Sequence, residues 1–422
     1  MNMKRLFLLL LIAFSLYAGA QPLQQLSLTT AWELAQKNYP AVKQKDLVRQ
    51  TAGISVENLQ KGFLPQFSIS GQATYQSDVT SVPISIPGFS IEAPNKDQYK
   101  LVADVNQLIY DGGLTREQKT LQQLNAKVED QKVEVELYKV KERINQLFLS
   151  ILYLDEQLKQ VELVKKDIET GIKKVEAQVQ NGVAFKSNLN MLKAELLKTG
   201  QRTVEISTSR KGLVAALSLF VGQELNEQVR LEQPVSLLVA DLNIDRPELK
   251  LYTEQENLIG QQDKLIQAKN QPKASLFAQA GYGRPGLNML KNEFAFYSIG
   301  GLRFNWSLGG LYTKKKEKEQ VQVNKKIVEV QKETFLLNTN AQLKQQQAEI
   351  DKLQQLISSD EAIIALRITV TEAAKAQLEN GVITANDFLK EVNAEDMARQ
   401  SLITHRVQLL QSQINYQTIL GK

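Results

Sequence analysis

Residues 114–180 read LTREQKTLQQLNAKVEDQKVEVELYKVKERINQLFLSILYLDEQLKQVELVKKDIETGIKKVEAQVQ, and this stretch decides the fold. Apolar residues recur in it at alternating steps of three and four without a proline, which is typical of a long helix with one apolar seam. The clearest part of the seam is Val140, Ile144, Leu147, Ile151, Leu154, Leu158, Val161, Val164, Ile168, Ile172, Val175 and Val179. At about 1.5 Å per residue the helix would be roughly 100 Å long, too long for a single globular core to bury.

The boundaries of this helix recur later in the chain. Its start follows Gly112-Gly113, and a second predicted helix, over residues 311–379, follows Gly309-Gly310. The two far ends are marked by Asn181-Gly182-Val183 and Asn380-Gly381-Val382, and the separation between copies changes by only two residues along the helix. An internal duplication is the simplest explanation.

The first twenty residues have the pattern of an export signal. Lys4 and Arg5 precede an apolar run over residues 6–16, and Ala18-Gly19-Ala20 has the small-x-small form of a signal peptidase site. We therefore expect a signal peptide over residues 1–20. A transmembrane anchor is the alternative, but this apolar run is too short to cross about 30 Å of hydrocarbon. The chain has no Cys, so neither disulfides nor a lipid-bearing cysteine are expected.

Charge and composition argue against several classes of function. The formal net charge is +5, a small excess for 422 residues, so a nucleic-acid partner is not indicated. His405 is the only histidine, and we expect no metal, no cofactor and no catalytic residue. There is also no Gly-x-x-x-x-Gly-Lys loop that would bind a nucleotide phosphate. The sequence predicts a protein that is not an enzyme.

The rest of the chain predicts two similar repeats. Residues 26–62 indicate two short helices, and after Pro65 the apolar period changes from 3.6 to 2, which predicts a strand. We expect a first repeat over 21–222 with strands at about 66–76 and 98–110, the long helix 114–180 and a return helix 184–222. A connector over 223–247 leads to a second repeat over 248–422, with strands at about 273–283 and 294–308, a long helix 311–379 and a return helix 384–420.

The four predicted strands each have one apolar face and are long enough to cross a bilayer when tilted. Aromatic residues lie near their ends, and alternation assigns Tyr75, Phe304 and Trp306 to a lipid face. A small soluble sheet is the alternative. Four strands cannot close a channel by themselves, and an open edge is not tolerated in lipid, so a membrane sheet would need several copies of the chain.

At this point several motifs together resemble one family. They are LSLTTAWELA at residues 26–35, Asn38-Tyr39-Pro40, Leu64-Pro65, the paired glycines and the two Asn-Gly tips. This combination resembles the TolC-like outer membrane efflux proteins over nearly all of the mature chain. The resemblance implies a fold that is mainly α with a membrane β part, in which duplicated long α-helical hairpins and four strands per chain build a trimeric α-barrel/β-barrel.

The resemblance also implies function, partners and location. It implies a homotrimer in the outer membrane with a long periplasmic extension, in contact with outer membrane lipid. The trimer would be a passive exit duct that works with a periplasmic adaptor protein and an inner membrane pump. The alternative function is a periplasmic coiled-coil adaptor or scaffold without a pore, a class that should lack amphipathic membrane strands.

Two groups of site residues follow from the resemblance. The family narrows its periplasmic end with acidic side chains, and here Asp387 and Lys390 occupy the two corresponding positions, so an opposite-charge pair would form the pore aperture. Alternatively, Asp387 simply stabilises the first turn of a helix. The tips at Asn181, Gly182, Val183, Asn380, Gly381 and Val382 would contact the adaptor, although the glycines could also serve only to end helices.

Overall fold

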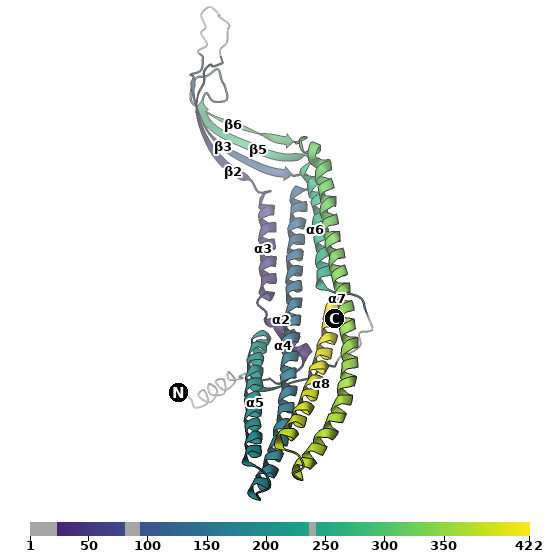
Figure 1. The fold of residues 1–422 in the computed structure, drawn as a ribbon. Helices are drawn as coiled ribbons and strands as arrows, with labels where there is room; N and C mark the ends of the chain where they lie inside the picture. The colour runs from purple at the N-terminus through teal and green to yellow at the C-terminus, as the bar shows by residue number, and fades with distance from the viewer. Residues whose placement is uncertain (1–22, 81–92, 236–241) are drawn as a thin grey trace, which may run out of the picture. The chain divides into compact units, whose positions relative to one another are not determined.

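The computed structural model describes residues 23–80, 93–235 and 242–422 (Figure 1). The predicted signal peptide, part of the loop between the first two strands and part of the connector lie outside the described residues. The chain forms two compact units, one from Met1–Lys43, Val133–Leu249 and Thr334–Lys422, the other from Gln44–Lys132 and Lys250–Glu333. Each unit takes segments from both predicted repeats, so the units are not the repeats. The division into repeats stays a prediction.

The second unit contains a four-stranded antiparallel sheet (Figure 1). Its strands are β2 (Gln66–Tyr75), β3 (Asp97–Tyr110), β5 (Lys273–Arg284) and β6 (Ala295–Asn305), in the order β2-β3-β5-β6. These bounds lie within a few residues of the predicted ones. The exception is the end of β6, because Trp306 lies just beyond the strand and its indole N–H donates to the Asn270 carbonyl at 3.1 Å. The sequence prediction that carried this strand to residue 308 was wrong.

The strand register gives the sheet one apolar and one polar face. Ile69, Ala103, Ala280 and Ser298 are successive partners across the sheet, and the row beside it contains Phe67, Val105, Ala278 and Gly300. The opposite face has rows such as Ser68, Asp104, Gln279 and Ile299. The pairing becomes irregular between Leu108 and Tyr110, close to Gln107, where the sequence alternation changes parity. The period-two pattern therefore predicted which side chains share a face.

Four helices join one end of the sheet, as Figure 1 shows. α3 (Val42–Lys61) leads into β2, and β3 is followed by α4 (Leu114–Gln180). α6 (Pro247–Lys269) leads into β5, and β6 is followed by α7 (Gly310–Glu379). The order helix, strand, strand, helix thus occurs twice. Both long helices have the bounds expected from their apolar period and flanking glycines, to within one residue.

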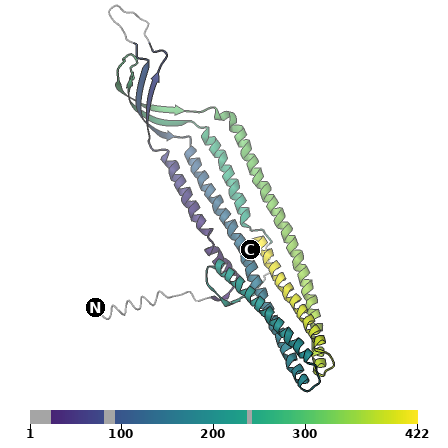
Figure 2. The same ribbon diagram turned by 60° about the vertical axis from the view of Figure 1, so that its left-hand side comes forward.

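The first unit packs two helical hairpins and a short sheet. It contains α2 (Leu28–Asn38), α5 (Lys186–Val221), α8 (Ala385–Leu420) and the adjoining parts of α4 and α7; Figure 2 shows α5 beside α4 and α8 beside α7. The seam of α4 lies in two apolar cores. Ile144 and Ile151 belong to a core with α2, α5 and β4, and Ile168 and Val175 belong to a core near the tips.

Two further strands were missed by the sequence analysis. β1 (Leu23–Leu26) and β4 (Leu225–Leu231) form a parallel pair, so the connector contains regular structure after all. The cause is tertiary. Val229 is fully buried in the first core, and Arg210 of α5 donates from Nη2 to the Val229 carbonyl at 2.8 Å while pairing with Asp155. Because β4 is short and is stabilised by an arginine distant in sequence, its own residues show almost no regular apolar period.

Candidate functional site

The first predicted contact site is the turn from α4 to α5, where the backbone forms a tight helix end. The Val183 N–H donates to the Gln178 carbonyl at 2.8 Å, and the Gly182 N–H donates to the Val179 carbonyl at 3.1 Å. These two bonds define a Schellman motif, which needs a left-handed residue, and Gly182 has φ of 73°. A side chain at Gly182 would meet no neighbouring atom, so conformation alone requires glycine there.

The second site, the turn from α7 to α8, repeats this geometry. Val382 donates to Gln377 at 2.8 Å and Gly381 donates to Leu378 at 3.1 Å, with φ of 68° at Gly381. The Asn380 side chain caps further by donating to the Ala376 carbonyl at 2.8 Å. Val183 and Val382 are both exposed, at 77% and 70%. Each tip therefore presents an exposed valine on a backbone of fixed shape.

The two tips are joined within the first unit. The Gln178 side-chain amide donates to the carbonyls of Leu378 and Glu379 at 2.9 and 3.1 Å, and Lys174 forms an ion pair with Glu379. Below these contacts Phe388 is fully buried against Gly171, which has no side chain to obstruct the ring. Sequence reasoning missed Lys174, Gln178 and Glu379 because their roles depend on the pairing of two helices distant in sequence.

Asp387 and Lys390, the predicted aperture residues, lie in the first turn of α8. Lys390 Nζ is 3.5 Å from Asp387 Oδ1, and both side chains are exposed. The other carboxylate oxygen accepts from the Thr384 hydroxyl at 2.7 Å and its backbone N–H at 3.3 Å, while the Asp387 N–H donates to Thr384 Oγ1 at 3.2 Å. These contacts form a capping box. The Thr384 hydroxyl, with help from Lys390, lowers the pKa of Asp387.

Asp387 is therefore part of a helix cap and also half of an exposed ion pair. The capping box accounts for an acid at this position through local structure alone. The pairing with Lys390 agrees with the expected geometry of an i, i+3 pair. A role in a pore aperture needs further copies of the chain, so it stays a prediction.

Phe185 is a candidate contact residue that the sequence analysis did not name. It is the N-cap of α5, makes no side-chain cap hydrogen bond and is 80% exposed. The corresponding residue of the second tip is Thr384. The sequence could have pointed to Phe185, because an aromatic residue stands there at a helix start where a polar capping residue is usual.

A polar layer lies between the helices of the first unit, away from the tips. Asp396 of α8 is buried and accepts from Arg202 Nη1 at 3.0 Å and from Gln160 Nε2 at 3.1 Å, which connects α8 to α5 and α4. Nearby, burial raises the pKa of Asp167. A buried carboxylate needs such partners, and they fix the relative register of three helices.

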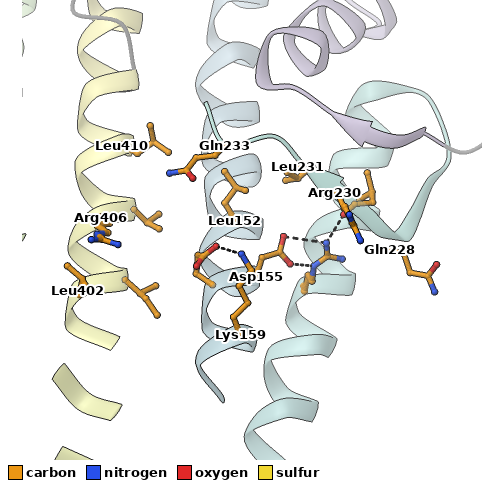
Figure 3. Close-up of a pocket in the computed structure, with 15 residues that line it drawn as sticks. Leu152, Asp155, Lys159, Gln228, Arg230, Leu231, Gln233, Leu402, Arg406 and Leu410 are labelled. Carbon is orange, nitrogen blue, oxygen red and sulfur yellow. Dashed lines mark hydrogen bonds and ion pairs between the residues drawn. The ribbon is translucent and has the colours of Figure 1, made fainter. Parts of the chain in front are cut away.

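A groove of about 740 Å³ lies between α4, β4 and α8 in the first unit. Figure 3 shows Leu402 and Leu410 of α8 on one side and Leu152 of α4 opposite them. Its charged residues are largely paired, because Asp155 binds Arg210 at 2.5 Å and Lys159 binds Glu156 at 2.6 Å. The ion pairs leave little unpaired charge in this groove.

His405 lies beside a buried acid. Its Nδ1 is 2.5 Å from Asp360 Oδ2, and this contact joins α8 to α7. Within residues 23–80, 93–235 and 242–422 no group of three or more His, Cys, Asp or Glu side chains could hold a metal ion. In the same residues no helix is both long and apolar enough to cross a membrane.

Comparison with known proteins supports the resemblance found in the sequence. Residues 31–223 match the outer membrane efflux protein family, while no curated protein matches the sequence. The fold is similar to that of VceC from Vibrio cholerae, with a TM-score of 0.65 and 16% identity over 93% of this chain and 96% of VceC.

Two further outer membrane channels have the same fold. CmeC from Campylobacter jejuni matches with a TM-score of 0.64 and 14% identity, over 93% of this chain and 85% of CmeC. MtrE from Neisseria gonorrhoeae, solved in its open state, matches with a TM-score of 0.66 and 13% identity, over 93% of this chain and 88% of MtrE. The resemblance to TolC-like outer membrane efflux proteins is confirmed.

Proposed function

We propose that this TolC-like chain is the outer membrane exit duct of a tripartite efflux or secretion system. It would form a homotrimer, with a twelve-stranded barrel in the outer membrane and a helical tunnel in the periplasm. A periplasmic adaptor protein and an inner membrane pump would supply cargo and energy, because the duct itself is a passive conduit. The observation that carries this proposal is the four-stranded sheet with its exposed apolar face.

That face is unusual for a soluble sheet. Phe67, Ile69 and Leu302 are all more than 75% exposed, and the described part of the chain places nothing over them. Contiguous exposed apolar surface of this kind marks an interface with lipid or protein. The opposite face carries Ser68, Asp104 and Gln279, which suits a water-filled interior. This division opposes the alternative of an adaptor or scaffold without a pore.

The edges of the sheet support assembly. In the described residues β2 and β6 each pair on one side only. An unpaired edge leaves backbone N–H and C=O groups without partners, which lipid does not tolerate. Pairing β6 of one copy with β2 of the next would close the barrel. The number three comes from the family resemblance.

Exposed apolar stripes on the helices also support a ring. In the second unit α3 exposes Leu47 and Ile54, and α7 exposes Val323, Ile327 and Val330. In the first unit α5 exposes Leu197 and Val204, and α7 exposes Ile363, Leu366 and Val370. Spacings of three, four and seven place these residues on single helix faces, as in a helical interface. Neighbouring copies would cover them.

The lipid-face assignment can be tested by arginine substitution at a chosen depth. Ile69 lies in the middle of β2, so Ile69→Arg should destabilise the inserted barrel by about 2–4 kcal/mol. Phe304 is one residue from the end of β6, so Phe304→Arg should cost only about 0–1 kcal/mol, as near an interface. Ser68→Arg, on the polar face beside Asp104, is the matched control. Equal yields of assembled protein from outer membranes for all three variants would contradict the assignment.

A further inference from the structure

The start of α7 carries a positive charge from lysine side chains, which a helix N-terminus does not favour. Lys314, Lys315 and Lys316 lie in its second turn, and its first turn contains no acidic residue. The N-terminus of a helix carries a partial positive charge, which favours acidic residues there and does not favour lysines. Lys61 and Lys269 lie at the ends of α3 and α6, beside the same sheet. These two lysines are favourable, because a helix C-terminus attracts cations.

At the start of α4, the other long helix, acidic side chains of the chain itself lie close to the free backbone N–H groups. Before α4, Asp111 accepts from the N–H groups of Gly113 at 2.8 Å and Thr115 at 2.6 Å, and Glu117 follows in the first turn. The matching position before α7 is Leu308, whose side chain cannot accept a hydrogen bond. Among the described residues Lys316 pairs with Glu319 and Lys315 forms no ion pair. The start of α7 therefore has lysines where the start of α4 has acidic side chains.

Exposed apolar and aromatic side chains lie close to these lysines in the sequence, beside Glu317 and Glu319. Tyr312 is 89% exposed, and Leu308 and Trp306 are also exposed. Tyr312, Lys315 and Lys316 are spaced by three and four residues, so they lie on one side of the helix. Trp306 lies two residues after Phe304, which belongs to the apolar face of the sheet. Aromatic residues beside lysines at the end of an apolar band are typical of the boundary between hydrocarbon and headgroups.

We infer that Tyr312, Lys315 and Lys316 form a binding surface for the phosphate groups of anionic phospholipids. This inference rests on the proposed function, because it requires the sheet to lie in a membrane. The lysines supply the charge that attracts the headgroup, and the aromatic residues contact the adjoining acyl chains. The anion that the helix start lacks would then come from the membrane. A free anion would not explain the exposed tyrosine and tryptophan.

The test uses the purified, detergent-solubilised full chain and its thermal unfolding. Titration with dioleoylphosphatidylglycerol should stabilise the protein more strongly than dioleoylphosphatidylcholine. Lys315→Gln/Lys316→Gln should weaken the apparent affinity for phosphatidylglycerol by about five-fold per lysine, roughly 25-fold in all, and leave that for phosphatidylcholine unchanged. The matched control is Lys344→Gln/Lys352→Gln on the same helix, since Lys352 pairs with Glu349 at 2.6 Å as Lys316 pairs with Glu319.

Several outcomes would overturn the inference. One is equal stabilisation by the two lipids, and another is an equal loss of affinity for phosphatidylglycerol in both double variants. A third is stabilisation by inorganic phosphate as strong as that by phosphatidylglycerol. A changed ion selectivity without altered lipid affinity would place the lysines in the duct instead. Failure of the inference and failure of the proposed function remain distinct, because a protein that conducts ions normally but shows no lipid preference contradicts only the former.

Discussion

The two tips of this chain share one backbone and differ in surface. Gly182 and Gly381 occupy the same left-handed position in the same Schellman motif. The next helix then begins differently, since α8 starts with the Thr384–Asp387 capping box and α5 starts with exposed, uncapped Phe185. The glycine sets the shape of a tip, and the residue three positions later sets either helix stability or apolar surface. The second tip has a helix cap, and the first tip has an exposed aromatic side chain in its place.

Replacing both glycines should have the largest effect. In Gly182→Val/Gly381→Val each valine would be held at positive φ, at a cost of about 1–3 kcal/mol per site, so the tips would change shape. Because the space around both glycines is open, assembly and membrane insertion should persist while export is lost. Gly212→Val, a helical position with equally open surroundings, is the control. Normal efflux at ordinary protein abundance would refute adaptor docking at the tips.

Replacing Phe185 at the start of α5 should separate its effect on helix stability from its effect on adaptor binding. Phe185→Thr provides a capping hydroxyl, which should stabilise the start of α5 by about 0.5–2 kcal/mol. It also removes an exposed aromatic side chain, a type that often dominates binding energy, so export should fall. Amide protection in the first turn of α5 should rise, while efflux should fall. A variant that gains protection and exports normally would show that Phe185 has no contact role.

The reverse change at the second tip should be smaller. Thr384→Val keeps the shape of the side chain but removes the hydroxyl that accepts the Asp387 N–H. We expect a loss of about 1 kcal/mol in local stability, seen as faster amide exchange at the start of α8. The start of α5 is uncapped already and should not change. Equal exchange rates in variant and parent would mean that the capping box contributes nothing.

The smallest expected difference is a pH dependence confined to the second tip. The pKa of Asp387 lies below its usual value of 3.8, mainly because of the hydrogen bond from Thr384. A lowered pKa in the folded state contributes stability that is fully present above about pH 3.8 and is lost as the pH falls through the folded value. The first tip has Asn188 at the corresponding position, which does not titrate. NMR titration in parent and Asp387→Asn protein should show this loss only in the parent.

Sequence patterns predicted the regular parts of this molecule and missed the parts that depend on distant partners. The long helices, the hairpin strands and the two tips have local signals. These signals are an apolar period of 3.6 or 2 and, at the tips, a glycine where the turn needs a positive φ. β4 and the Gln178 contacts have none, because Arg210 and Leu378 act from other helices. Trp306 was assigned to a strand because its alternation continues past Asn305, where the indole instead bonds to Asn270. Phe185 was missed because a pattern search seeks polar caps at that position.

The most direct test of the central claim is single-channel recording of the purified full chain in planar bilayers, with the mass of the conducting particles measured in detergent. The account predicts ion-conducting particles with the mass of three chains, because four strands with two free edges close only with further copies. Folded protein that stays monomeric in detergent-free buffer and conducts no current would contradict it.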